Sequence, residues 1–243
     1  AYNSWADWVS GLDQGPPEER SRPKPYTSGQ NLIARGVVTQ NETLVVALVY
    51  LAASAGITGL LAGQTTTWVW LPWLVAVACA PLYSWGKFNY TNETWLFLGF
   101  GPAAAMLGAA SAPGPDLWRA ALASLPLGIL FGYGAELVDQ MIDAEANVPK
   151  GLRNMGAWCW KNKVPLLWPL VGILGVVISS HALLVGFEVL SAPTYAAIIA
   201  ILPIPLMAPA MERGSTKAIM AGLGLIFLYG LTLVVLQGIY GGG

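Results

Sequence analysis

Two stretches of this chain carry carboxylate and amide side chains at spacings that suit a helix. Asn3 lies four residues before Asp7, and Asp139 lies four residues before Asp143. Residues four apart share one face of an α-helix, so each pair presents two oxygen ligands in one direction. Mg²⁺ takes oxygen ligands and is usually bound by one or two carboxylates together with a substrate phosphate. We therefore predict one magnesium site built from both stretches, with ligands drawn from Asn3, Asp7, Glu136, Asp139 and Asp143.

Basic residues flank both acidic stretches. Arg22 and Lys24 follow the first stretch. Lys150 and Arg153 follow the second, and Lys87 lies between the two in the sequence. Lysine and arginine form charge-assisted hydrogen bonds with phosphate oxygens, so the combination favours a magnesium diphosphate site. For any one of these charges, a topology anchor or a solvated loop position is the alternative interpretation. The predicted diphosphate ligands are Asn3, Arg22, Lys87, Lys150 and Arg153.

Most of the remaining chain is apolar enough to lie in a membrane. Of its 243 residues, 55% are hydrophobic and only 10% are charged, whereas a soluble domain carries about 25% charged residues. A helix needs about 20 apolar residues to cross the hydrocarbon core of a bilayer. We predict an all-α, polytopic transmembrane helix bundle with seven visible spans, at about residues 43–62, 66–84, 94–112, 117–135, 164–187, 191–211 and 218–240.

The basic residues indicate how these spans are oriented. When successive loops are assigned to alternate sides, every lysine and arginine except Arg119 falls on one side of the membrane. Cytoplasmic loops carry an excess of Lys and Arg, so this side is predicted to be the cytoplasmic one. Both acidic stretches fall on the same side. We therefore expect a multi-pass integral membrane protein whose candidate site lies at its cytoplasmic face.

The first acidic stretch resembles a motif of the UbiA-type intramembrane prenyltransferases. That family carries two Asp-rich motifs on cytoplasmic loops, and the first has the form N-D-x-x-D-x-x-x-G-x-D in its dihydroxynaphthoate branch. Asn3, Asp7, Gly11 and Asp13 match this spacing, and Ser4 replaces the usual first aspartate.

Further motifs follow in the family's order. Tyr83 and Lys87 match its Y-x-x-x-K motif, and Asp139 and Asp143 match its second Asp-rich motif, D-x-x-x-D. Residues 22–29 are similar to its R-P-x-P-S-G stretch, with two residues inserted. Short apolar segments that resemble the 1,4-dihydroxy-2-naphthoate polyprenyltransferase branch occur at 100–102 and 125–128.

The resemblance implies a fold, an activity and residue roles. UbiA-type enzymes have nine helices, so residues 1–243 are expected to form a single membrane-embedded prenyltransferase domain that lacks the first helix and most of the second. The implied reaction is Mg²⁺-dependent transfer of a polyprenyl group from an allylic prenyl diphosphate to a small aromatic acceptor similar to dihydroxynaphthoate, as in quinone and menaquinone biosynthesis. The implied catalytic residues are Asp7, Tyr83, Lys87, Asp139 and Asp143, and the resemblance adds Asp13 to the predicted metal ligands.

Other interpretations stay open at this point. Within the family the acceptor can be a different one, and some members cyclise terpenes without an acceptor. A secondary transporter is the alternative from another class, because Gly and Pro interrupt the spans, as at Pro203 and Pro205. The spans carry few ionisable groups, which weighs against transport. The lipid bilayer is the expected surrounding, and no nucleic acid partner is expected.

His181 is the one histidine, and it lies well inside a predicted span. An ionisable group in that position is a functional candidate by default. Because it lies away from the motif loops, we expect it to be neutral and to form a hydrogen-bonded contact between helices.

Overall fold

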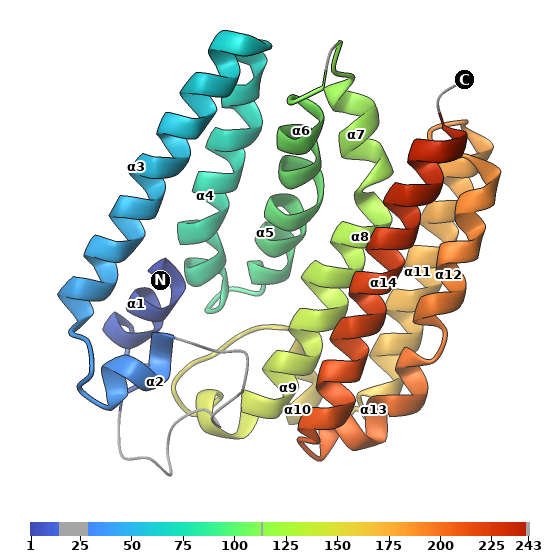
Figure 1. Ribbon diagram of the computed structural model, residues 1–243. Helices are drawn as coiled ribbons and strands as arrows, with labels where there is room; N and C mark the ends of the chain where they lie inside the picture. The colour runs from blue at the N-terminus through green and yellow to red at the C-terminus, as the bar shows by residue number, and fades with distance from the viewer. Residues whose placement is uncertain (15–28, 113, 242–243) are drawn as a thin grey trace.

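A computed structural model of the chain describes residues 1–14, 29–112 and 114–241. Within these ranges every regular element is a helix, and no strand occurs. Figure 1 shows the long helices standing side by side, with the short helices α1 (Tyr2–Val9), α2 (Gly29–Ala34) and α10 (Met155–Lys161) towards one end. The prediction of an all-α helix bundle is confirmed.

Five segments are long and apolar enough to cross a membrane. They agree with five of the predicted spans and support the prediction of a multi-pass membrane protein. The helices concerned are α3 (Gln40–Gln64), α4 (Trp70–Gly86), α11 (Leu167–Gly186), the consecutive pair α12 (Tyr195–Ile201) and α13 (Ile204–Glu212), and α14 (Thr216–Tyr240).

The predicted span at 117–135 is a bent helix that runs further than expected. Its first part, α7 (Leu117–Ala123), meets the second at an angle of 47°. Pro126 lies at the start of the second part and lacks the N–H that would continue the hydrogen bonding, which accounts for the bend. The second part continues without interruption through α8 (Leu125–Ile129), η4 (Leu130–Ala135) and α9 (Glu136–Asn147). The second acidic stretch, which lies beyond the predicted end of this span, is therefore helical, as its spacing by four predicts.

The predicted span at 94–112 is also helical, but it does not meet the same criteria of length and hydropathy. It consists of α5 (Asn92–Leu98), η3 (Gly99–Ala103) and α6 (Ala104–Ala109). Asn92 and Glu93 occupy its first turn, so polar residues shorten its apolar stretch. The described residues therefore give five membrane-crossing helices, or six when the bent helix counts as one span, in place of the seven predicted.

Two π-helical segments, η3 and η4, bring their helices unusually close to their neighbours. A Cβ atom on Gly101 would lie 2.8 Å from Cα of Gly128, and one on Gly132 would lie 2.6 Å from the backbone nitrogen of Phe97. Only glycine permits these approaches. π-Helical turns are rare and occur frequently at functional sites. Here they set α5 beside the start of α9, where the second acidic stretch begins.

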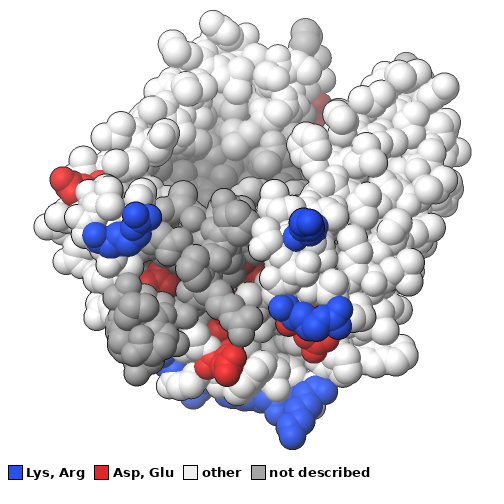
Figure 2. Space-filling model, turned by 60° about the horizontal axis from the view of Figure 1, so that its bottom comes forward, with Lys and Arg blue, Asp and Glu red and all other residues white. Residues whose placement is uncertain are grey.

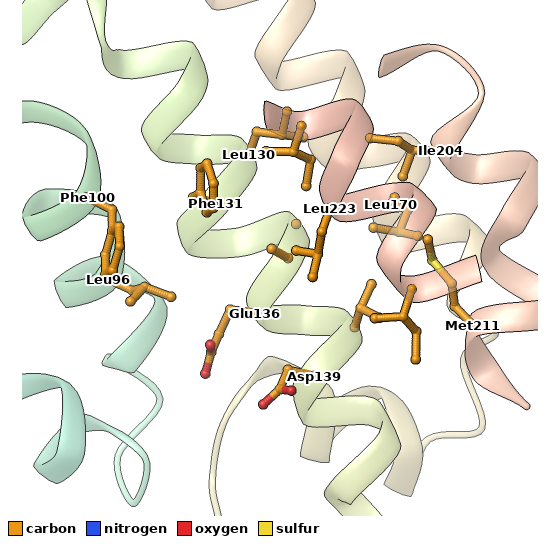
Figure 3. A pocket seen from close by; sticks show the side chains of 16 residues that line it. Leu96, Phe100, Leu130, Phe131, Glu136, Asp139, Leu170, Ile204, Met211 and Leu223 are labelled. Atoms are coloured by element: carbon orange, nitrogen blue, oxygen red, sulfur yellow. The ribbon is translucent and has the colours of Figure 1, made fainter. Parts of the chain in front are cut away.

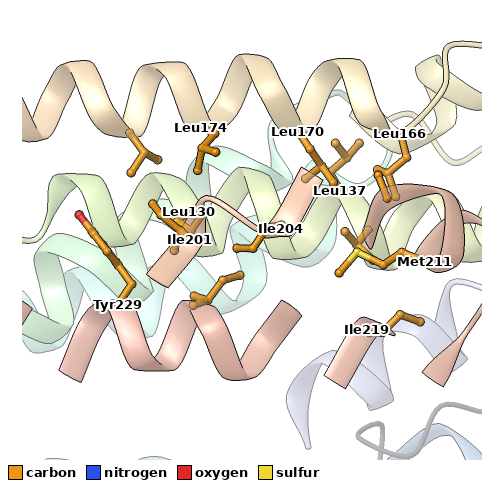
Figure 4. Packing of buried hydrophobic residues seen from close by; sticks show 14 of the residues in the cluster. Leu130, Leu137, Leu166, Leu170, Leu174, Ile201, Ile204, Met211, Ile219 and Tyr229 are labelled. Atoms are coloured by element: carbon orange, nitrogen blue, oxygen red, sulfur yellow. The ribbon is translucent and has the colours of Figure 1, made fainter. Parts of the chain in front are cut away.

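The largest apolar core lies between the bent helix and the three spans that follow it. Leu137 of α9, Leu166 before α11 and Ile201 of α12 are fully buried in it, as Figure 4 shows. Full burial of each such side chain stabilises the fold by about 1.5–3 kcal/mol relative to its exposure to water. This core fixes α9, and with it one wall of the site described below.

His181 lies in this core as a neutral contact between helices. Its Nε2 lies 3.0 Å from Oγ1 of Thr194, and its Nδ1 lies 3.0 Å from the hydroxyl of Tyr229. Because the Thr194 hydroxyl donates its hydrogen to the carbonyl oxygen of Ser191, it accepts one from Nε2, and Nδ1 then accepts from Tyr229. The prediction of a hydrogen-bonded histidine inside a span is confirmed.

Candidate functional site

The two acidic stretches, far apart in the sequence, line one polar cavity of about 90 Å³. Its walls come from α1 and the turn after it, from the C-terminal end of α4, and from α9. We call it the acidic cavity. The residues predicted from the sequence that line it are Asn3, Asp7, Asp13, Tyr83, Lys87, Glu136, Asp139 and Asp143.

Lys87 forms a buried ion pair in the acidic cavity. Its Nζ lies 2.7 Å from Oδ1 and 2.8 Å from Oδ2 of Asp7, and it donates to Oδ1 of Asn3 at 2.9 Å. Nδ2 of Asn3 donates to Asp7 at 3.0 Å, so the two side chains spaced four apart on α1 act as one unit. Nζ also lies 4.9 Å from the centre of the Tyr83 ring, within the range of a cation–π interaction.

The turn after α1 is fixed to the far part of the chain. Gly11 adopts a φ of 84°, which glycine tolerates and other residues rarely do. This turn directs Leu12 into a small apolar cluster with Leu152 and Ala157. Nζ of Lys150 donates to the carbonyl oxygens of Leu12 at 2.6 Å and Gln14 at 3.0 Å. The connection between α9 and α10 therefore holds the first acidic stretch against the second.

Asp13, at the end of this turn, is buried among other charges. Its side chain is 5% exposed, and Oδ2 has no hydrogen-bond partner among the described residues. Burial raises the pKa of Asp13 to about 7, and repulsion from Asp7 adds to the rise. Lys87 and Lys150 oppose it without cancelling it. The charges around Asp13 therefore do not offset the cost of burying its carboxylate.

On the opposite side, Glu136 is held by three donors. Its Oε1 accepts hydrogen bonds from the Tyr83 hydroxyl at 2.8 Å, from Nδ2 of Asn92 at 3.1 Å and from Nε2 of Gln140 at 3.1 Å. Oε1 of Gln140 in turn accepts from the backbone nitrogen of Gly156, which ties α9 to α10. Glu136 therefore has a fixed orientation, and it connects α4, α5 and α9.

Sequence reasoning missed two of these partners, Asn92 and Gln140. Gln140 lies four residues after Glu136, so helical spacing alone was sufficient to place it on the same face. Asn92 begins the Asn-x-Thr sequence at residues 92–94, yet its side chain is fully buried against Glu136. Nothing in the sequence around it indicates this contact, because the π-helical segments that bring α5 to α9 have no clear sequence pattern.

Two of the predicted diphosphate ligands that the structure describes, Lys150 and Arg153, do not line the cavity. The ammonium of Lys150 binds the backbone carbonyl oxygens described above. Arg153 exposes its side chain, while its backbone nitrogen donates to the carbonyl oxygen of Lys87 at 2.7 Å and its carbonyl oxygen accepts from the backbone nitrogen of Tyr90 at 2.8 Å. Both residues hold the site together in this structure. Arg22 lies outside the described residues.

A second cavity, of about 230 Å³, adjoins the acidic cavity and shares Glu136 and Asp139 with it. Figure 3 shows the two carboxylates at one end and apolar side chains along the rest. We call it the aliphatic cavity. Its walls come from α5, η4, α9, α11, α13 and α14, and include Leu130, Phe131, Leu170, Ile204, Met211 and Leu223.

A third space, of about 450 Å³, lies between α4 and the segment α5–η3–α6. We call it the aromatic recess, because Tyr83, Trp95 and Phe100 are among its lining residues. It shares Asn3 and Tyr83 with the acidic cavity, and Leu96 and Phe100 with the aliphatic cavity. The three spaces therefore adjoin one another around Tyr83, Glu136 and Leu96.

Compared with models of known protein families, with curated proteins and with solved structures, the chain has no match. The geometry of the three spaces therefore carries the functional argument.

The donor atoms of the acidic cavity suit a hard divalent cation. The cavity offers carboxylate and amide oxygens, which are the ligands of Mg²⁺, and one buried oxygen of Asp13 still lacks a hydrogen-bond partner among the described residues. In the described part of the chain, no three acidic, histidine or cysteine side chains lie ready to enclose a metal ion. Mg²⁺ is usually bound by one or two carboxylates plus water and phosphate, so the residues fit an ion that binds together with a phosphate.

Charge is concentrated at this end of the molecule. Figure 2 shows lysine, arginine, aspartate and glutamate side chains gathered on it, whereas the flanks visible in that view are almost free of charge. The acidic cavity therefore lies where the charged end of the molecule meets the apolar bundle.

Proposed function

We propose that this chain is a UbiA-type intramembrane prenyltransferase, which transfers a polyprenyl group from an allylic prenyl diphosphate to a small aromatic acceptor similar to dihydroxynaphthoate. One observation carries the proposal: the acidic cavity and the aliphatic cavity share Glu136 and Asp139. A magnesium diphosphate suits the first space, and an isoprenoid chain suits the second. A single allylic diphosphate would occupy both.

In this proposal the residues of the acidic cavity stabilise the leaving group. Asp7, Asp13, Asp139 and Asp143 would hold Mg²⁺, which would supply Lewis-acid stabilisation of the diphosphate oxygens. Lys87, which pairs with Asp7 in this structure, turns to the diphosphate when that anion is bound. Charge placed in advance at a developing anion is usually the largest catalytic contribution.

The bond from C1 of the chain to the diphosphate oxygen breaks with its electron pair on the oxygen, and an allylic cation remains. A ring carbon of the acceptor attacks C1, and the ring proton passes to the released diphosphate. Water would destroy the cation, and the apolar walls of the aliphatic cavity exclude water from it. The hydrogen bond from Tyr83 to Glu136 fixes the C-terminal end of α4 against α9, so that this end of α4 lines the acidic cavity.

We further propose that α5–η3–α6 is a membrane span despite its polar first turn, which gives seven spans and places the acidic cavity on the cytoplasmic side. Asn92 and Glu93 are buried in protein contacts, with Glu136 and with the backbone nitrogen of Met155 respectively. Polar groups that are satisfied by protein are tolerated near the membrane.

The test is prenyl transfer in membranes that contain the protein, with labelled geranyl, farnesyl and longer prenyl diphosphates and a panel of aromatic acceptors, with and without Mg²⁺. We expect Mg²⁺-dependent transfer, and a loss on the order of 100-fold or more in Asp7→Asn and Asp139→Asn. Glu212→Gln changes an exposed carboxylate outside the acidic cavity and serves as the matched control.

The outcomes separate the alternatives. Transfer that persists in Asp7→Asn and Asp139→Asn contradicts the metal assignment. Diphosphate release without any acceptor favours a terpene cyclase, and transfer to another ring system changes the acceptor. Solute flux in liposomes without diphosphate release favours a transporter and rejects the proposal.

A further inference from the structure

The aromatic recess is built differently from the aliphatic cavity. Small side chains, among them Ala76 and Ala104, leave a space between α4 and the segment α5–η3–α6. Two aromatic side chains at its wall are each fixed by a hydrogen bond. Nε1 of Trp95 donates to Oγ1 of Thr91 at 3.2 Å, and the Tyr83 hydroxyl donates to Glu136 at 2.8 Å. A fixed, aromatic wall suits a planar ring, because aromatic pairs gain about 0.5–1.5 kcal/mol beyond the area that they bury.

The polar groups at the two apolar spaces also differ. The aliphatic cavity ends at the carboxylates of Glu136 and Asp139, where a metal-bound diphosphate is expected. The aromatic recess ends at Asn3 and the hydroxyl-bearing ring of Tyr83, which are neutral hydrogen-bonding groups. Neutral donors and acceptors suit the hydroxyl or carboxyl substituent of a small aromatic molecule.

We infer that the aromatic recess is the binding site of the aromatic acceptor, with the ring beside Tyr83 and Trp95 and its polar substituent towards Asn3. The inference rests on the proposed function. The isoprenoid chain occupies the aliphatic cavity on the other side of Leu96 and Phe100, which line both spaces. The two substrates meet beside Tyr83 and Glu136.

The placement of the acceptor in the aromatic recess can be tested in the unmodified chain, because a cysteine lines this recess. Cys79 lines the aromatic recess, whereas Cys159 is buried on α10, away from all three spaces, and serves as an internal reference. The experiment measures alkylation of each thiol by N-phenylmaleimide with mass spectrometry. The ligand probes are 1-hydroxy-2-naphthoate, a ring that does not oxidise to a thiol-reactive quinone, and farnesyl diphosphate with Mg²⁺.

We expect the naphthoate at ten times its Kd to slow alkylation of Cys79 about tenfold, because protection follows the fraction of sites occupied. Farnesyl diphosphate with Mg²⁺ leaves that rate nearly unchanged, and neither ligand changes the rate at Cys159. Protection of Cys79 by farnesyl diphosphate alone would place the chain in this recess and overturn the inference. Absence of protection by the naphthoate overturns it as well.

A pair of variants gives a second, kinetic readout. Ala76→Leu places a larger side chain in the aromatic recess. We expect it to raise the KM for the acceptor about tenfold, because an oversized side chain in a packed space is unfavourable. The KM for the donor is expected to stay unchanged. Leu223→Phe narrows the aliphatic cavity, so we expect the longest prenyl diphosphate that serves as donor to be a shorter one than in the unmodified protein. If Ala76→Leu changes the longest donor chain that is accepted and leaves the KM for the acceptor unchanged, the inference is contradicted while the proposed function stays intact. A complete lack of prenyl transfer by the unmodified protein rejects the proposed function itself.

Discussion

At the scale of single residues, Lys87 forms an ion pair with Asp7 in this structure, and in the proposed function the diphosphate binds the same ammonium. The ion pair is short and buried, with Lys87 also bonded to Asn3. Two charges in a low-dielectric site interact strongly, and removal of one partner leaves the other charge buried. In the proposed function Lys87 therefore has two roles, one in the stability of the unliganded protein and one in donor binding.

We predict that Lys87→Met lowers the free energy of unfolding by about 3–5 kcal/mol and abolishes binding of prenyl diphosphate. Asp7→Asn in the same chain is expected to restore most of the stability, because the buried negative charge is then gone, but not to restore donor binding. Thermal unfolding in detergent and a binding assay measure the two effects. If the double variant is no more stable than Lys87→Met alone, the lost stability of Lys87→Met does not come from the unpaired charge of Asp7.

Asp13 gives the site a pH dependence of a defined sign. Its pKa of about 7 in the folded protein lies above the ordinary value of about 4 for an aspartate in an unfolded chain. The folded state therefore binds the proton more tightly, so the metal-free protein loses stability as the pH rises from about 4 to about 7. Mg²⁺ binds the ionised form, so its affinity is expected to rise over pH 6–8 and to level off above.

Asp13→Asn is expected to remove most of this dependence, both in unfolding experiments with EDTA and in Mg²⁺ titrations. Glu212→Gln, an exposed change, serves as the control. A metal affinity that falls with rising pH, or one whose slope survives in Asp13→Asn, contradicts the assignment.

At the scale of elements, the turn after α1 is placed by the connection between α9 and α10. Lys150 binds two carbonyl oxygens of this turn, and Leu12 packs against Leu152 and Ala157. Lys150 therefore acts as a positioning residue here. A role as a phosphate ligand would require it to leave these carbonyl oxygens.

We predict that Lys150→Gln and Leu12→Ala each raise the KM for the donor about tenfold and increase cleavage of the first 14 residues in limited proteolysis. Because both changes act on the same contact, the double variant is expected to be little worse than either single one. Lys161→Gln, an exposed change on α10, is the matched control. If Lys150→Gln reduces kcat and leaves proteolysis unaltered, the lysine acts on the phosphate instead.

Much at this scale was predictable from the sequence, and some was not. Hydropathy predicted the long helices, and spacing by four predicted that Asn3 and Asp7 share a face, which their hydrogen bond confirms. The contact of Lys150 was not predictable, since backbone carbonyl oxygens exist at every residue and have no sequence pattern. The continuation of the bent helix through Asp143 was missed because hydropathy marks only the apolar part of a helix, and the predicted span ended at residue 135, just before the acidic residues.

At the scale of the whole molecule, the bundle has one charged end and a largely apolar body. α3 is nearly unburied along its apolar length, which suits contact with lipid. Which loops lie on the same side of the membrane depends on whether the bent helix crosses the membrane or turns back within it. If α7 and α8–α9 form one span, Trp118 lies across the membrane from Lys161.

We therefore predict that a membrane-impermeant maleimide added to intact cells labels Trp118→Cys but not Lys161→Cys or Arg213→Cys. All three side chains are exposed, both native cysteines are buried, and labelling of the unmodified protein measures the background of those two thiols. Labelling of all three after permeabilisation is the control. Labelling of Trp118→Cys only after permeabilisation would mean that the bent helix re-enters the side from which it came.

The contact between Leu12 and the α9–α10 connection also bears on how the protein is made. Lys150 reaches Leu12 across 138 residues of sequence, so the partners of the first acidic turn are translated long after the turn itself. Contacts of such separation form late, because a long loop must close before they are made. A ribosome-bound chain that ends before Leu152 should leave residues 1–14 open to added protease, and a chain released at full length should protect them. Assembly of the site is thus tied to synthesis of the connection between α9 and α10, and a polypeptide interrupted before it is expected to expose the carboxylates of the first acidic stretch without forming a pocket.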